Sequence, residues 1–102
     1  MQELEWLEKF FWSCCQNGWG NERGIKIHTL SNPGWSMEII LEDTDLENHH
    51  FEKIDLERNE HDWVICWMAD KKFQGRGGVQ NLSEIIKIFR NWVEEFDRAN
   101  KS

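Results

Sequence analysis

The chain has 102 residues and carries 12 Lys and Arg against 19 Asp and Glu, which gives a formal net charge of −7 at pH 7. This length predicts one domain, residues 1–102, whose modest core leaves little room for a deep, enclosed active site. The negative charge repels phosphate backbones and argues against nucleic-acid binding, whereas it favours encounter with a basic protein.

An amphipathic helix is predicted at the start of the chain, over residues 3–15. Its apolar side chains recur at helical spacing, at Leu4, Leu7, Phe11 and Cys14, and Trp6 and Phe10 widen the apolar stripe. Three Gly and two Asn within residues 16–24 then end the pattern.

The N-terminal residues also bear on location. They include acids where a signal peptide needs bases, and no apolar run approaches the ~18 residues that span a bilayer. Cys14, Cys15 and Cys66 lack paired spacing, so they are interpreted as small apolar residues in a reducing compartment. We therefore expect a cytoplasmic protein with no membrane interaction.

Two strands are predicted on either side of the only proline. Ile25 and Ile27 alternate with polar residues, and the following run places Trp35, Met37, Ile39 and Leu41 on one face, with Ser36, Glu38 and Ile40 on the other. Between them, Asn32-Pro33-Gly34-Trp35 has the chemistry of a type II turn, in which Gly34 takes a positive φ. A bare type II link would splay a hairpin, so we expect a slightly longer loop joining antiparallel strands.

Two more strands are predicted after the polar connection at residues 42–50. Residues 51–57 place Ile54 and Leu56 on one face and Asp55 and Glu57 on the other. Residues 63–69 are apolar on both faces, with Trp63, Ile65 and Trp67 opposite Val64, Cys66 and Met68. Such a strand is central or covered, which suggests an aromatic patch that a partner covers.

The last part of the chain is interpreted as a glycine-rich loop, residues 70–80, followed by a helix that runs to about Arg98. Asn81 and Glu84 have the spacing of a capping box. The predicted fold is therefore α+β, a four-stranded antiparallel β-meander with an N-terminal and a C-terminal helix packed on one face.

Several patterns that resemble catalytic or ligand sites have plainer structural explanations. His49-His50 with His61 lacks the tight ligand pairs of zinc sites, and Glu60 beside His61, in a cluster with Glu57 and Asp62, has no accompanying nucleophile. Gly75 to Gly78 lacks the Lys-Ser/Thr of a phosphate-binding loop, and Cys14 and Cys66 occupy apolar positions. We therefore predict no catalytic residue, no metal site and no cofactor.

The acidic residues near the strands' polar face are the remaining candidates for function: Glu38, Glu42, Asp43, Asp45, Asp55 and Glu57. Charged runs are usually solvated faces, but a binding surface for a basic protein is the main alternative. The predicted partner-binding residues are Glu38, Asp55 and Glu57 as charges, with Trp63 and Trp67 as aromatic anchors.

A family resemblance covers nearly the whole chain. The run GIKIHTLSNPGWSMEIIL resembles the core signature of the Immunity protein 53 family, as do LEWLEKF, FEKIDLERNEHDWVIC and FQGRGGVQNLSEIIKIFRNWVEEF in the same order. Ser31 departs from the family, which more often has an acidic residue before the Asn-Pro-Gly-Trp turn, and Cys14-Cys15 is peculiar to this chain.

The resemblance implies a single α+β domain without catalytic activity that binds and neutralises a cognate bacterial polymorphic toxin. An acidic protein suits the basic clefts of nucleases, so the net charge leads to the hypothesis that the toxin is a nuclease. The alternatives are a small-ligand-binding module with a Trp-lined pocket between sheet and helices, and a hydrolase that uses Glu60 and His61. A homodimer through an apolar sheet face is also open.

Overall fold

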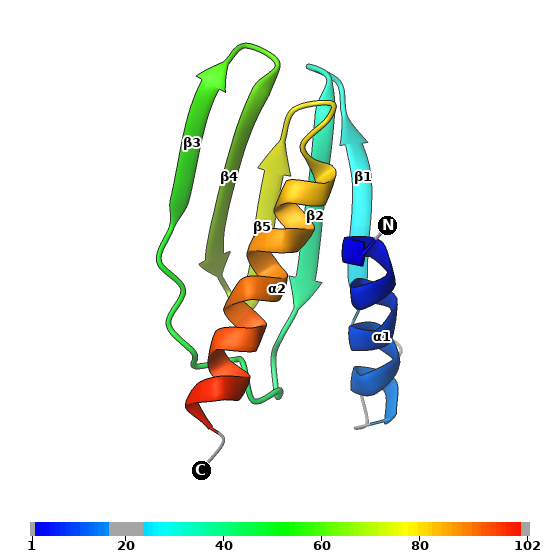
Figure 1. Cartoon of the computed structure of the whole chain (residues 1–102), viewed down its shortest axis with the longest axis vertical. Helices are drawn as coiled ribbons and strands as arrows, with labels where there is room; N and C mark the ends of the chain where they lie inside the picture. Colours follow the sequence, from blue (N-terminus) through cyan, green and yellow to red (C-terminus); the bar gives the residue numbers. More distant parts are fainter. Residues whose placement is uncertain (1, 17–23, 101–102) are drawn as a thin grey trace.

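The computed structural model describes residues 2–16 and 24–100, which form a five-stranded antiparallel sheet and two helices (Figure 1). The elements are α1 (Gln2–Gln16), β1 (Ile25–Leu30), β2 (Gly34–Ile40), β3 (Ile54–Asn59), β4 (Asp62–Ala69), β5 (Lys72–Gly77) and α2 (Leu82–Ala99). The α+β class and both helices are confirmed, while residues 17–23 of the glycine- and asparagine-rich break predicted at residues 16–24 lie outside the described residues.

The prediction of a four-stranded meander is wrong in one element. Residues 72–77, interpreted as a loop, form β5 at the centre of the sheet, whose strand order is β1-β2-β5-β4-β3. β2 therefore pairs with β5 and not with β3. The β1–β2 hairpin and the β3–β4–β5 meander are joined edge to edge by this central pair.

β5 was not predicted because glycines occupy two of its three positions that face the helices. Phe73, Gly75 and Gly77 face the helices, and only Phe73 gives an apolar signal there. The two glycines make room for α2, because a Cβ on Gly75 would overlap Cγ2 of Ile85 and one on Gly77 would lie 3.0 Å from Cβ of Asn81. A close approach of helix to sheet thus replaces side-chain packing at the middle of the core.

The β1–β2 hairpin has the predicted longer loop, Ser31 to Pro33, with Leu30 opposite Gly34. The predicted positive φ at Gly34 is wrong, because Gly24 is the one glycine with a positive φ among the described residues. Gly34 is required for a different reason: a Cβ there would overlap the carbonyl oxygen of Gly77 on β5.

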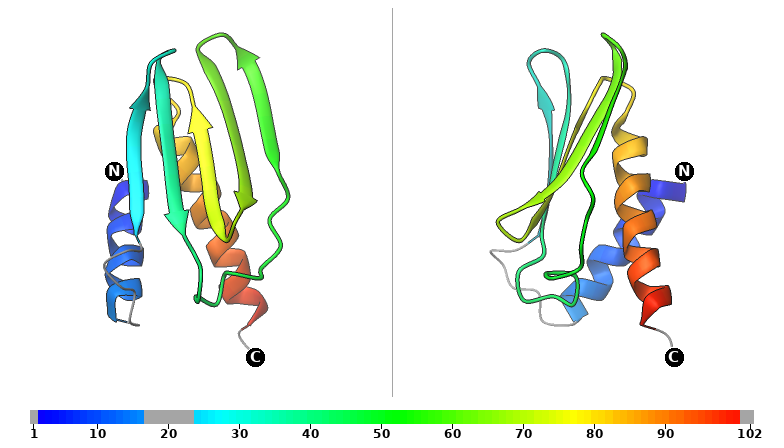
Figure 2. Two further views of the ribbon diagram at one scale, coloured as in Figure 1. Left: turned by 180° about the vertical axis from the view of Figure 1, so that it is seen from behind. Right: turned by 90° about the vertical axis from the view of Figure 1, so that its left-hand side faces the viewer.

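Both helices cover the same face of the sheet, as Figure 2 shows. α2 crosses β5, β4 and β2, and α1 lies beside α2 on the β1 side (Figure 1). The core between them contains these fully buried side chains: Met37, Ile39, Leu41, Val64, Cys66, Phe73, Ile85 and Phe89.

The packed side of α1 is rotated from the predicted stripe. The rings of Trp6 and Phe10 lie 5.9 Å and 5.1 Å from that of Phe89 on α2. Leu7 is buried with them, whereas Leu4 and Phe11 remain 41% and 44% exposed. The sequence pattern predicted a wide apolar stripe on α1, and only its Trp6–Phe10 side packs against α2.

The connection from β2 to β3 closes one end of the core with Leu41 and Leu46, which are both buried. Thr44 stabilises its turn, because its hydroxyl donates to the Leu41 carbonyl at 2.7 Å and accepts from the Leu46 amide at 3.2 Å. The connection is then fixed to α2, where the Trp92 indole donates to the His50 carbonyl at 2.8 Å.

The predicted capping box at the start of α2 is also wrong. Asn81 makes no side-chain cap; its amide instead donates to Asp62 at 2.9 Å and to Glu84 at 3.0 Å. Arg58 of β3 donates to the same two carboxylates, so this network joins β3, β4 and α2.

Candidate protein-binding surface

The second face of the sheet carries no helix among the described residues (Figure 2), and we call it the open face. The strand register assigns its side chains, which are Lys26, His28 and Leu30 of β1, Ser36, Glu38 and Ile40 of β2, Lys72, Gln74 and Arg76 of β5, Trp63, Ile65, Trp67 and Ala69 of β4, and Asp55 and Glu57 of β3. All five predicted partner-binding residues thus lie on one face.

Four of the five predicted residues form one cluster on the neighbouring strands β3 and β4. Trp63 and Trp67 are half-buried along β4, with Asp55 and Glu57 on the adjoining edge strand, where Glu57 pairs with Trp63. The Arg76 guanidinium lies 5.6 Å from the centre of the Trp67 ring, a cation–π distance. The arrangement offers partly exposed aromatic rings beside two carboxylates that have no ion pair within residues 2–16 and 24–100.

Glu38 lies apart from this cluster. It is two strands from Trp67, about 10 Å at the spacing of a sheet. Gln74 donates to its carboxylate at 3.5 Å, Lys72 lies 4.0 Å away and Lys26 faces it across the register. These neighbours already offset its charge, so Glu38 contributes less negative potential than predicted.

Fewer acidic residues lie on the open face than the sequence indicated. The open face has three acids, Glu38, Asp55 and Glu57, and three bases, Lys26, Lys72 and Arg76. Glu42, Asp43 and Asp45 belong instead to the β2–β3 connection. Negative charge on this face is therefore concentrated at the β3 margin.

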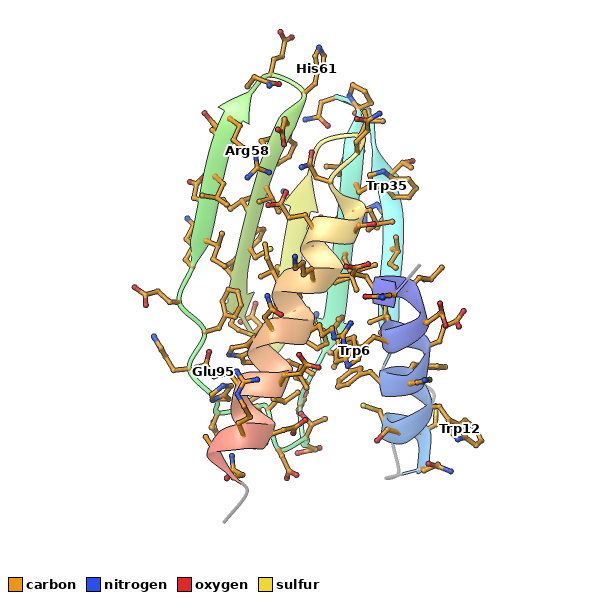
Figure 3. All side chains as sticks on the ribbon, viewed as in Figure 1. Trp6, Trp12, Trp35, Arg58, His61 and Glu95 are labelled. Atoms are coloured by element: carbon orange, nitrogen blue, oxygen red, sulfur yellow. The ribbon has the colours of Figure 1, made fainter. Side chains whose placement is uncertain are left out.

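The structure separates the histidines that were considered as metal ligands. His61 lies in the exposed β3–β4 turn (Figure 3), and His49 and His50 precede β3 at its other end, so they cannot share an ion. Within residues 2–16 and 24–100 no group of three His, Cys, Asp or Glu side chains could hold a metal. Asp62, next to His61, is occupied by Arg58 and Asn81.

The glycine-rich stretch is likewise unsuited to phosphate. Gly75 and Gly77 lie in β5 and pair with residues of β2 and β4, and the Gly78 amide donates to the Trp63 carbonyl at 3.0 Å. The carboxylates of Asp62 and Glu84 flank the start of α2 and would repel an anion there.

Cys14 and Cys66 have the properties of packing residues, as predicted, whereas Cys15 is exposed. Burial raises the pKa of Cys66 to about 12. Burial, followed by repulsion from Cys15, raises the pKa of Cys14 to about 11. Both remain protonated thiols at neutral pH and are poor nucleophiles.

The sequence analysis missed one feature of the open face and one feature of the helix side of the sheet. Arg76 was assigned to a loop, although Lys72, Gln74 and Arg76 alternate with period two, which is the signal of a strand. An open groove beside β3, with a volume of about 490 Å³, is formed by α2 and the segment leading into β3. The groove depends on how two distant segments pack, so the sequence carries no signal for it.

The fold and the open face together define a small α+β domain with a broad, partly aromatic surface. The chain belongs to the Immunity protein 53 family, because the sequence model of that family matches residues 4–94. This match confirms the resemblance. Neither the curated proteins nor the solved structures include a match. In the described part of the chain, no helix is long and apolar enough to cross a membrane.

Proposed function

We propose that this protein neutralises a cognate bacterial toxin by binding it non-covalently, one to one, in the cytoplasm and without catalysis. Family membership supports the role, and the cluster of Asp55, Glu57, Trp63 and Trp67 on the open face carries the choice of surface. Partly exposed Trp anchors beside charged residues are typical of binding hot spots.

The chemistry of the surface suggests what the toxin presents. The free carboxylates at the β3 margin and the overall charge of −7 favour a basic surface, such as the substrate cleft of a nuclease. Arg76 and Lys72 lie near the centre of the open face, so the toxin needs an acidic or polar group opposite them.

Co-expression with a candidate toxin domain tests the proposal. We expect the chain to restore growth and to co-purify with the toxin at a one-to-one ratio. Asp55→Lys with Glu57→Lys should lower the association rate at least about tenfold and weaken its salt dependence, because charge steering is lost.

A matched control keeps the change in net charge but moves it to the helices. Glu8→Lys with Asp97→Lys alters exposed positions on α1 and α2, away from the open face, and should leave association nearly unchanged. Equal effects of the two pairs would remove the β3 margin from the interface. Failure to restore growth or to co-purify would reject the function itself.

A further inference from the structure

The helices leave the β3 side of their own face uncovered. α2 contacts the three inner strands and α1 occupies the β1 side, whereas β3 stands away from both helices (Figure 1). Ile54 and Leu56 point to this helix-bearing side, and Leu56 is 43% exposed. Beside Ile54 lies the open groove of about 490 Å³, within the ~300–1,000 Å³ range of ligand-sized clefts.

The floor of this β3 groove is apolar and fixed. It is lined by Phe51, Ile54, Ile88 and Trp92, with Glu52 and Glu95 at its rim. Trp92 cannot turn freely, because its indole donates to the His50 carbonyl and its ring lies 5.0 Å from His49 and 5.4 Å from Phe51. The floor is therefore formed before any partner arrives.

The rim carries two acids from different segments of the chain. Glu52 belongs to the segment that leads into β3, and Glu95, labelled in Figure 3, belongs to α2, as do Ile88 and Trp92. Both are exposed, and neither has an ion pair within the part of the chain that the structure describes. Their neighbour Glu94 is paired with Arg90 at 3.2 Å, and Lys53 supplies one positive charge to the rim.

An apolar floor below two carboxylates has a specific complement. Lys and Arg side chains combine an aliphatic stem with a terminal cation, so the stem would cover Ile54, Ile88 and Trp92 while the cation lies between Glu52 and Glu95. An anion would be repelled at this rim, and a neutral ligand would cover the carboxylates without pairing them.

We propose that the β3 groove binds a Lys or Arg side chain presented by the protein partner. The inference rests on the proposed function and extends it, because it adds a second contact around the edge of β3. Asp55 and Glu57 lie on the open side of this strand, and the groove lies on its helix side. A partner that grips the β3 edge would contact both.

The groove can be tested without the toxin. Isotope-labelled protein is titrated with acetyl-Gly-Arg-Gly-amide and, separately, with the same peptide containing citrulline, which has the shape of arginine but no charge. We expect the arginine peptide alone to shift the NMR signals of the Trp92 indole and of the Glu52 and Glu95 amides. The other indole signals serve as internal references.

Variants locate the charge that is responsible. Glu52→Gln with Glu95→Gln should weaken binding of the arginine peptide about fivefold. Asp55→Asn with Glu57→Gln, on the open side of the same strand, should leave it unchanged.

Two outcomes would overturn the groove proposal: equal shifts with the citrulline peptide, or shifts confined to residues outside the groove. Either would leave toxin neutralisation intact, since that is judged by growth and co-purification. Conversely, arginine-specific shifts in the groove of a chain that fails to protect cells would retain the groove and reject the function.

Discussion

At the scale of single residues, the hydrogen-bond network around Asp62 is the main group of polar side-chain contacts between elements of the fold. Asp62 accepts from Arg58 at 3.0 Å and from Asn81 at 2.9 Å, and Arg58 also pairs with Glu84. These contacts join β3, β4 and the first turn of α2. They explain why the Asn81 side chain binds two carboxylates and makes no capping hydrogen bond to the backbone of α2.

The network gives the protein a pH dependence of stability. Hydrogen bonds from Arg58 and then from Asn81 hold the pKa of Asp62 below its ordinary value. A lowered folded-state pKa stabilises the fold above the ordinary carboxyl value of about 4, and this contribution is lost as the pH falls through the folded-state pKa.

We therefore expect Asp62→Asn to be less stable than the wild type at pH 6, with the gap narrowing below about pH 4 as wild-type Asp62 becomes protonated. Urea unfolding at a series of pH values measures this. Asp55→Asn, which removes a carboxylate that has no ion pair in the described residues, is the matched control. A gap that stays constant from pH 6 to about pH 3 would contradict the role of Asp62.

At the scale of elements, the turn between β4 and β5 decides the topology. Asp70 and Lys71 have φ of 54° and 63°, so both adopt the left-handed conformation of a type I′ hairpin turn. Such turns prefer Asn-Gly or Asp-Gly, and Lys at the second position hides the hairpin signal. The exposed Lys71 also forms an ion pair with the partly buried Glu47 at 3.4 Å.

Substitutions at two successive lysines separate backbone strain from side-chain loss. At Lys71, the Gly variant should be about 1 kcal/mol more stable than the Ala variant, since both lose the ion pair but only Gly tolerates positive φ without cost. At Lys72, an extended residue of β5, the order should reverse by about 0.5–1 kcal/mol. Thermal or urea unfolding compares the four variants, and Ala above Gly at both sites would mean that no type I′ turn forms.

At the scale of the whole molecule, the sheet is organised around its central pair, β2 and β5. β5 has hydrogen-bonded neighbours on both sides and is covered by α2, while β1 and β3 each pair on one side. Backbone groups of inner strands open only with much of the fold, whereas edge strands open locally.

Native-state hydrogen exchange should therefore rank the amides of β5 as the slowest, those of the other inner strands, β2 and β4, next, and the outward-facing amides of β1 and β3 as the fastest within the sheet. Residues 72–77 are the decisive segment, because their sequence resembles a loop. Exchange in that segment at the rate of the exposed turn at Glu60 and His61 would contradict a central strand.

The sequence by itself determined the two helices, four of the five strands and the faces of those strands. Alternation with period two placed Met37 and Ile39 opposite Glu38, and Trp63 and Trp67 opposite Val64 and Cys66, because neighbouring residues of a strand point to opposite sides. The same alternation placed the five predicted binding residues on one face of the sheet. Separately, long runs of the sequence identified the family.

Only the tertiary structure decided how those parts meet. α2 approaches β5 so closely that Gly75 and Gly77 are required there. Glycine is required at position 34 because a Cβ would overlap the Gly77 carbonyl, and not because of a turn. The pairing of Glu38, the Asp62 network and the β3 groove likewise join residues that lie far apart in the chain. Local patterns set the conformation of a segment, but non-local contacts set its neighbours, and these contacts cannot be read from periodicity.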